Sequence, residues 1–370
     1  MKILIAGDFV PRFRIQKMTE SCDYSFFEEV KEYTAKSDYS IINLEAPIVK
    51  GVCDPIVKTG PNLKCSPYTM EAIKYAGFNC VTLANNHFYD YGNRGVVDTI
   101  DSCKSSEIDY VGGGVNLAAA EDILYRKVAN KTLAVINFCE NEWSIASETD
   151  GGSAPLNLIH NVRNIQKAKK TADYVLVIIH GGTEQYQLPS PRMKETYRFL
   201  VDQGADAVVN HHQHCYSGYE VYKEKPIFYG LGNFCFDKND PNDNLWNEGY
   251  LVQIDFSEEK INFTVLPYIQ CSKSANVSFL AEKSAFEESI DNLNKIIADE
   301  HKLQDYFAEM AISKSYLQIL EPYNCNNKIL RILKAKGILP SFLSREKKNL
   351  ILNVFRCEAH KDVIFKLLQQ

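Results

Sequence analysis

Residues 2–8 read KILIAGD, an apolar run that ends at a glycine and a carboxylate. An unbroken apolar row such as Ile3 to Ala6 is typical of a strand that is buried on both faces of its sheet. Similar runs follow in the first two-thirds of the chain, at residues 39–42, 80–83, 133–136, 174–179, 207–209 and 227–229. We therefore predict a buried strand at each of these places.

Segments whose apolar residues have helical spacing lie between these runs, at residues 26–35, 69–76, 95–103, 159–171 and 191–203. Strands that alternate with helices along a chain indicate an α/β fold. After Phe234 polar and apolar residues alternate instead. This period of two predicts half-exposed antiparallel strands at residues 250–256 and 261–266, which would close a sheet.

The last hundred residues are helical in character, with periodic segments at residues 286–298, 303–320, 329–333 and 349–354. They contain no cluster of catalytic side chains. We therefore expect two domains, residues 1–270 with the chemistry and a helical C-terminal region at residues 271–370. We favour packing of these helices on the domain's own surface over docking on another subunit, although the spacing permits both.

Composition excludes several classes of protein. The formal net charge of −6 provides no field that attracts a polyanion, so we expect no nucleic-acid partner. No apolar stretch approaches the roughly 20 residues needed to span a bilayer, and the first residues do not read as an export signal, so direct membrane insertion is not expected. The 11 cysteines are scattered without a CxxC pair, which fits a reducing compartment, and we expect a cytoplasmic protein.

Polar clusters directly follow five of the predicted strands. They are Gly7-Asp8, Asn43-Leu44-Glu45, Asn85-Asn86-His87, His180-Gly181-Gly182-Thr183-Glu184 and His211-His212-Gln213-His214. The carboxyl ends of strands form the ligand crevice of open α/β sheets. We therefore expect these clusters to meet at one point although they lie far apart in the sequence.

The side chains in these clusters favour a metal site, and its predicted ligands are Asp8, Glu45, Asn86, His180, His212 and His214. Imidazole with carboxylate or carboxamide oxygen suits Mn²⁺, Fe or Zn²⁺ better than a metal that prefers thiolates. Taken singly, Asp8 and Glu45 are better explained as helix N-caps or first-turn acids, and His87 is explained equally well as a hydrogen-bonded structural histidine. Only the combination points to metal chemistry.

The motifs together resemble those of the capsule-synthesis CapA family, which includes the poly-γ-glutamate capsule proteins. The resemblance covers about residues 1–270. It rests on Gly7-Asp8, Asn43-Leu44-Glu45, LANNH at 83–87 with DYG at 90–92, His180-x-Gly-x-Glu184, His212-x-His214, and YGLGNF at 229–234 with Asp237. That family is similar to calcineurin-like metallophosphoesterases, which implies a four-layer α/β/β/α sandwich and hydrolase chemistry at a metal centre.

The resemblance also implies roles for individual residues. Asp8 and His214 would bind one divalent ion, Asn86, His180 and His212 a second, and Glu45 would bridge the two. His87 would be the acid that protonates a leaving group. Lys58, Glu184 and Asn233 would line the substrate pocket.

Two departures from the classical phosphoesterase pattern bear on how many ions are bound. Val10 occupies the place of a histidine, and Glu45 replaces the usual bridging aspartate. We therefore expect one or two ions of Mn, Fe or Zn in each chain.

The function implied is a metal-dependent hydrolase or transferase that acts on a phosphoester, amide or glycan-linked intermediate of capsule or surface-polymer biosynthesis. Its substrate would be a small molecule or polymer-linked, and its partners would belong to surface-polymer biosynthesis. The alternative is a non-catalytic polymer-binding or assembly protein of a capsule biosynthesis complex.

Overall fold

The computed structural model describes residues 1–58, 60–238, 240, 243–312, 327–336, 338–339 and 344–356. By compactness the chain divides into two units, Met1–Leu303 and Gln304–Gln370. Every predicted site residue belongs to the first unit. The first unit continues past residue 270, and the predicted division at that residue stays a prediction.

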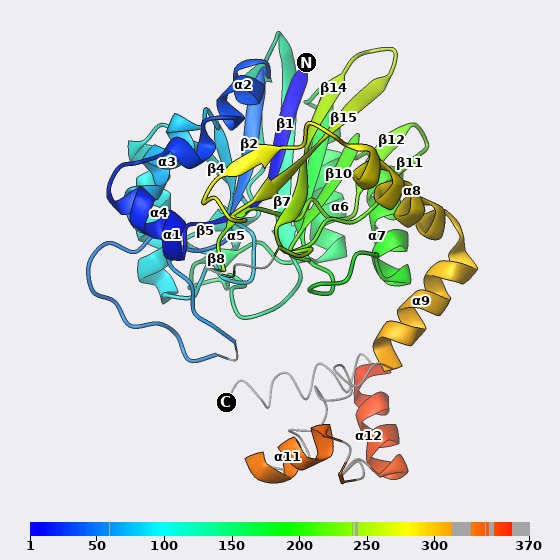
Figure 1. Cartoon of the computed structure of the whole chain (residues 1–370). Coiled ribbons are helices and arrows are strands. Elements are labelled where there is room, and N and C mark those ends of the chain that lie inside the picture. The colour runs from blue at the N-terminus through cyan, green and yellow to red at the C-terminus, as the bar shows by residue number, and fades with distance from the viewer. Residues whose placement is uncertain are drawn as a thin grey trace. The chain divides into compact units, whose positions relative to one another are not determined.

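Two sheets form the middle of the first unit (Figure 1). The first has the strand order β16-β15-β14-β1-β2-β3-β4, and β13 also pairs with β1. Its strands are β1 Lys2–Val10, β2 Tyr39–Leu44, β3 Cys80–Thr82, β4 Asp109–Val111, β13 Asn233–Phe236, β14 Glu248–Phe256, β15 Ile261–Gln270 and β16 Val277–Phe279. The strands β1 to β4 run parallel, and β14 and β15 are antiparallel strands on the other side of β1. The two antiparallel strands predicted after Phe234 are therefore confirmed.

The second sheet has the strand order β11-β12-β10-β9-β7-β6. Its strands are β6 Leu124–Val128, β7 Lys131–Cys139, β9 Tyr174–His180, β10 Ala207–His211, β11 Tyr219–Tyr222 and β12 Lys225–Phe228. The four inner strands are parallel, and β6 and β11 are antiparallel edges. A separate short pair joins β5 Gly113–Gly114 to β8 Gly152–Ser153. All of the predicted buried strands lie in the two large sheets.

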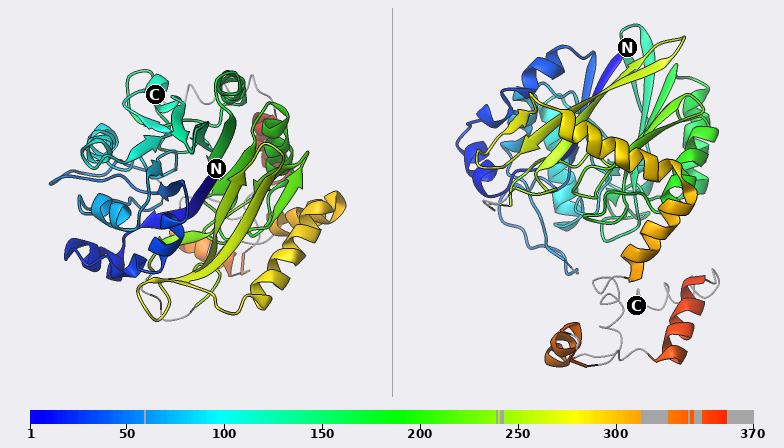
Figure 2. Two further views of the ribbon diagram at one scale, coloured as in Figure 1. Left: turned by 90° about the horizontal axis from the view of Figure 1, so that it is seen from above. Right: turned by 45° about the vertical axis from the view of Figure 1, so that its right-hand side comes forward.

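Helices cover the outer faces of both sheets (Figures 1 and 2). Beside the first sheet lie α1 Phe13–Glu20, α2 Val30–Ala35, α3 Thr69–Tyr75 and α4 Gly92–Ser105. Beside the second lie α6 Leu158–Lys169 and α7 Pro191–Asp202, and α8 Ser284–Ala298 packs against β11. The short helix α5 Leu117–Ala120 packs against β5 and β8.

Alternate side chains of β1 enter two different cores. Ile3 and Ile5 belong to a buried cluster that includes Val177 of β9, on the opposite sheet. Leu4 and Ala6 belong to a second cluster that includes helix residues such as Val96 of α4. Successive side chains of a strand point to opposite faces, so one apolar run contributes to both interiors. The expected four-layer α/β/β/α sandwich is thus confirmed.

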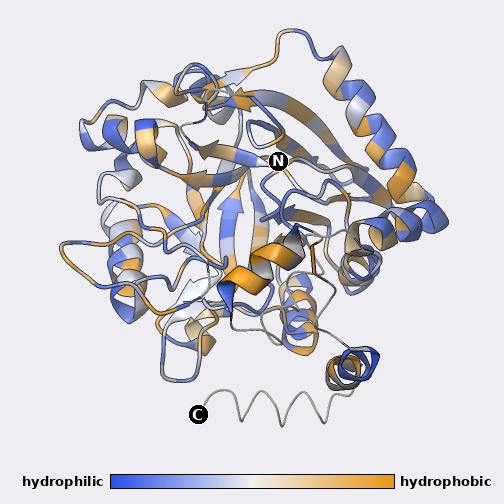
Figure 3. Ribbon diagram, turned by 60° about the horizontal axis from the view of Figure 1, so that its bottom comes forward, coloured by the Kyte–Doolittle hydropathy of each residue, from blue (hydrophilic) through white to orange (hydrophobic). Residues whose placement is uncertain are grey.

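The C-terminal region contains the helices α9 Glu300–Ile312, α11 Lys328–Ala335 and α12 Arg345–Arg356. Its ribbons carry both apolar and polar residues, as do the helices that cover the sheets (Figure 3). The helices predicted near residues 329–333 and 349–354 are confirmed, and the part of the 303–320 prediction beyond Ile312 lies outside the described residues. None of the described helices combines the length and the apolar character that a membrane crossing requires.

The single helix predicted at residues 26–35 is wrong. The chain forms a 3₁₀ turn, η1 Ser25–Phe27, and the α-helix α2 begins only at Val30. Phe26 and Phe27 are both buried, and the ring of Phe27 stacks on Phe234 with 5.3 Å between centroids. Two consecutive rings cannot both lie on one narrow stripe of a surface helix, so the tighter turn accommodates them.

At Gly7, β1 passes close to the backbone of Gly232. An ideal Cβ at Gly7 would lie 1.9 Å from the carbonyl oxygen of Gly232, which also accepts a hydrogen bond from the backbone N–H of Asp8 at 3.4 Å. We expect Gly7→Ala to lower the free energy of unfolding by about 3 kcal/mol or more, measured by chemical denaturation.

The matched control is Gly51→Ala, because no atom of the described residues lies within 4 Å of a Cβ at that exposed position. Its φ of +81° alone should make the change cost about 1 kcal/mol. Equal stability of Gly7→Ala and the wild type would show that β1 and Gly232 do not meet in this way.

Candidate metal centre

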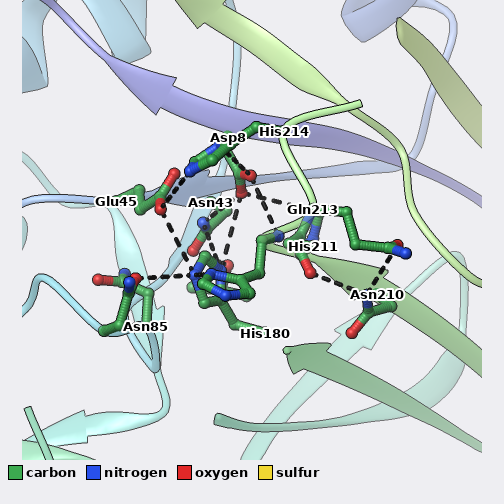
Figure 4. A network of polar contacts seen from close by, with 12 residues as sticks. Asp8, Asn43, Glu45, Asn85, His180, Asn210, His211, Gln213 and His214 are labelled. Atoms are coloured by element: carbon green, nitrogen blue, oxygen red, sulfur yellow. Dashed lines mark hydrogen bonds and ion pairs between the residues drawn. The ribbon is translucent and has the colours of Figure 1, made fainter. Parts of the chain in front are cut away.

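The predicted ligands come together at the carboxyl ends of strands from both sheets. Figure 4 shows four of them, Asp8, Glu45, His180 and His214, close to one another. They are Asp8 in β1, Glu45 directly after β2, Asn86 after β3, His180 at the end of β9, and His212 and His214 after β10. All of these side chains are buried. The sequence pattern indicated one crevice but not that three of its strand ends belong to one sheet and two to the other.

One group of donor atoms surrounds Nε2 of His180. His212 Nδ1 and Asn86 Oδ1 each lie 3.1 Å from this nitrogen, and Glu45 Oε1 lies 3.5 Å from it. Neighbouring ligands of one ion are about 2.9–3.6 Å apart when each bond to the ion is about 2.0–2.2 Å long. The spacing therefore suits a single divalent cation between these atoms.

A second group consists of Asp8, Glu45 and His214. Nε2 of His214 lies 3.7 Å from Glu45 Oε1, and Nδ1 of His214 lies 3.7 Å from Asp8 Oδ2. One ligand atom from each of the three residues lies within 4.8 Å of the other two. Glu45 belongs to both groups. Its carboxylate therefore lies where it could bridge two ions.

Glu45 is the least satisfied of the predicted ligands within the described part of the chain. It is 0% exposed, and neither carboxylate oxygen has a hydrogen-bond partner among the described residues. Burial raises its pKa well above the ordinary value, and the nearby Asp8 raises it further. A buried carboxylate without donors must either take up a proton or meet a cation.

Burial also shifts the pKa values of Asp8, His180 and His214. Burial raises the pKa of Asp8 to about 7, although hydrogen bonds from Asn43 and the His212 N–H oppose the rise. Burial lowers the pKa of His214 to about 3 and that of His180 well below its usual range. Both imidazoles are therefore neutral at pH 7 and keep a lone pair for a metal.

Asn233 fixes the orientation of His214. Its Nδ2 donates to the carbonyl oxygens of His214 and Trp246, so its Oδ1 must accept from His214 Nδ1, 2.9 Å away. Nε2 of His214 is then the nitrogen with the free lone pair, and it is the one that faces Glu45. Val10, which stands in the place of a histidine, is fully buried and is paired in the sheet with Phe236.

The backbone after β10 is held in an unusual conformation. His212 and His214 have φ values of +92° and +55°, a region that residues other than glycine rarely adopt. The turn brings the backbone N–H of His212 to within 3.2 Å of Asp8 Oδ2. Strain of this kind, of about 1–3 kcal/mol per residue, is typical of functional sites.

The remaining predicted residues lie around these donor groups. His87 is buried, and its Nδ1 lies 2.7 Å from Asp90 Oδ2. Lys58 lies beside it, whereas Glu184 is exposed in the loop after β9. The substrate-binding roles of Lys58, Glu184 and Asn233 stay predictions.

Asn43 and His211 also reach the centre, although the sequence analysis gave them no role. Asn43 Nδ2 donates to Asp8 Oδ1 at 2.7 Å and lies 3.4 Å from Nδ1 of His180, so it links both sheets. His211 is buried, neither of its ring nitrogens is hydrogen-bonded within the described part of the chain, and its Nδ1 lies 3.8 Å from Asp8 Oδ1. Both residues lie close to predicted ligands in the sequence, which could have marked them as candidates. The sequence alone does not show which of the side chains near a ligand point toward the metal centre.

The family model that matches this chain and two of its relatives are named for capsule or PGA biosynthesis. Residues 2–238 match the family described as bacterial capsule synthesis protein PGA_cap. The chain is 38% identical over 248 residues to the capsule biosynthesis protein CapA of Bacillus anthracis, covering 64% of this chain and 60% of that protein. It is 33% identical over 236 residues to the PGA biosynthesis protein CapA of Bacillus subtilis (strain 168), covering 63% and 62%. The match thus spans about six-tenths of the length of these relatives.

Solved structures show weaker likeness. A hypothetical protein from Thermus thermophilus superposes with a TM-score of 0.46 at 13% identity, covering 73% of this chain and 98% of that one. A 5'-nucleotidase from Candida albicans gives a TM-score of 0.44 at 9% identity, covering 84% and 56%.

Metal binding should release protons, because the raised pKa values of Asp8 and Glu45 leave these carboxyls protonated in metal-free protein at pH 6. His180 and His214 are already neutral and have no proton to lose. We expect Mn²⁺ or Zn²⁺ to displace about one to two protons per chain at pH 6, and the apparent affinity to rise as the pH approaches 7. Calorimetric titration in buffers of different ionisation enthalpy measures this number.

Glu45→Gln should lower both the affinity and the proton release. Glu142→Gln is the matched control, because that carboxylate is 41% exposed and lies 3.8 Å from Nε2 of His212 at the rim. Tight binding without proton release would show that these carboxyls are not ligands.

Proposed function

The chain belongs to the bacterial capsule synthesis protein family, and we propose that it is a metal-dependent hydrolase or transferase within that family. Its substrate would be a phosphoester, amide or glycan-linked intermediate of capsule or surface-polymer biosynthesis, either small or polymer-linked. The proposal rests mainly on one observation: two groups of possible metal ligands share Glu45. The carboxylate of Glu45 has no hydrogen-bond partner among the described residues.

The donor set suits Mn, Fe or Zn, because it combines imidazoles with carboxylate and carboxamide oxygens and includes no thiolate. His180, His212 and Asn86 with Glu45 would hold one ion, and Asp8, His214 and Glu45 a second. A metal bound there would lower the pKa of water, providing a nucleophile at neutral pH, and would neutralise charge on the substrate.

The chain's own residues would orient the site and move the proton. His87 lies outside both donor groups and its Nδ1 is engaged with Asp90, so its Nε2 remains to donate a proton to a leaving group. Asn43 and Asn233 hold Asp8 and His214 in place. Burial of the whole cluster excludes bulk water from these contacts.

The names of the relatives guide the choice of substrates. One relative is called a PGA biosynthesis protein, and a Mycobacterium tuberculosis relative, 26% identical over 229 residues, a probable polyglutamine synthesis accessory protein. We therefore include γ-glutamyl amides beside phosphoesters as candidates. A cytoplasmic step with partners in surface-polymer biosynthesis is part of the same proposal.

A second candidate function is non-catalytic binding or assembly of the polymer. Val10 is the observation that favours it, because the Asp8 side of the centre then has His214 but not the second imidazole that classical enzymes use. Metal content separates the two functions, since a binding protein has no need of stoichiometric metal after growth in metal-replete medium.

Protein loaded with Mn²⁺ should hydrolyse at least one of three probes: a phosphomonoester, a phosphodiester or a γ-glutamyl amide. His87→Asn should lower kcat by about 10²–10⁴-fold, as expected for the loss of a general acid, with metal content unchanged. Steady-state kinetics and elemental analysis provide both readings.

His160→Asn is the control, because His160 pairs with Glu121 on the surface and its side chain is 41% exposed. It should behave as the wild type does. Inactivity of the metal-loaded wild type toward all three probes, or full activity of His87→Asn, would contradict the proposal.

A further inference from the structure

Lys58 is a buried ammonium beside the candidate acid. It lies between β2 and α3, and its side chain is only 3% exposed. Its Nζ forms an ion pair with Oδ1 of Asp90 and lies 3.2 Å from Nδ1 of His87. A lysine that recruits an anionic substrate must present its charge to solvent first, and this one does not.

Asp90 joins the lysine to the imidazole. It is fully buried, its Oδ1 faces Lys58, and its Oδ2 lies 2.7 Å from Nδ1 of His87. A carboxylate only accepts hydrogen bonds, so Nδ1 of His87 must carry a proton in this contact. Nε2 is then the only ring nitrogen that can reach a substrate.

The backbone on both sides of Lys58 is tied to the same residue. The N–H of Ile56 donates to the carbonyl oxygen of Asp90 at 2.9 Å, and the N–H of Leu63 donates to Asp90 Oδ2 at 2.7 Å. By contrast, Val52 and Val57 in this segment are fully exposed. The segment is therefore anchored at Asp90, and Lys58 lies at the anchor.

We propose that Lys58 is a positioning residue for His87: its ammonium fixes the carboxylate of Asp90, which in turn holds the His87 ring with Nε2 toward the metal centre. This inference rests on the proposed function and replaces the substrate-binding role expected from the sequence. Lys58 also compensates the buried charge of Asp90, so its removal would leave a buried carboxylate that competes for other donors.

The kinetic test uses two phosphate monoesters that differ only in the leaving group, a nitrophenol and an alkyl alcohol. Protonation by a general acid matters for the alkoxide and little for the nitrophenolate. Lys58→Met should lower kcat for the alkyl ester by about tenfold or more, with KM, metal content and nitrophenyl ester turnover nearly unchanged. Lys58→Arg should restore part of the lost rate.

The double variant Lys58→Met with His87→Asn should be no slower than His87→Asn alone, because both changes remove one function. Lys64→Met is the control, since Lys64 is an exposed lysine of the same segment. A raised KM with kcat retained would overturn the proposal in favour of substrate binding, and so would additive losses in the double variant.

A second measurement does not depend on activity. In metal-free protein with ¹⁵N-labelled histidine, the ring signals of His87 should report a protonated Nδ1 and should shift in Lys58→Met but not in Lys64→Met. Unchanged His87 signals in Lys58→Met would overturn the proposal. If the wild type is inert toward every ester and amide, the proposed function fails, and this spectrum still decides the role of Lys58.

Discussion

The carboxylate of Glu45, buried without a hydrogen-bond donor among the residues that the structure describes, is the constraint on which the centre depends. Three imidazoles and the carboxylate of Asp8 surround it, and burial disfavours the charged form of each of the groups whose shift is resolved. Burying such a cluster without a bound cation costs free energy, because its polar groups lose their contacts with water and gain few partners in return. Bound cations would satisfy its lone pairs and its negative charge together, which explains why a stable sandwich tolerates it.

The fold could be predicted in large part because its strands are buried on both faces. Runs such as Ile3 to Ala6 have no polar face, so their burial follows from composition alone. Some short elements escaped prediction, among them β4 and α1, because little apolar surface marks them. The division of the strands between two sheets was also out of reach, since pairing partners lie far apart in the sequence.

The candidate site was predictable in its membership and less so in its internal geometry. Every predicted ligand lies near the carboxyl end of a strand or in the loop that follows it, and strand ends have a fixed place in an α/β fold. Lys58 is different because it lies in a long segment in which the structure describes no helix or strand, and there the sequence gives no direction for a side chain. Its contacts with Asp90 and His87 emerge only from the way that segment folds back, and they support the positioning role that we propose in place of substrate binding.

The most direct test of the metal centre is a crystal structure of the Mn²⁺-loaded protein with anomalous scattering data. We expect metal within about 2.0–2.3 Å of a Glu45 oxygen, coordinated by His180 on one side and, where a second ion binds, by His214 on the other. Metal bound elsewhere in the chain, or His180 and His214 turned to separate sites without Glu45, would contradict it.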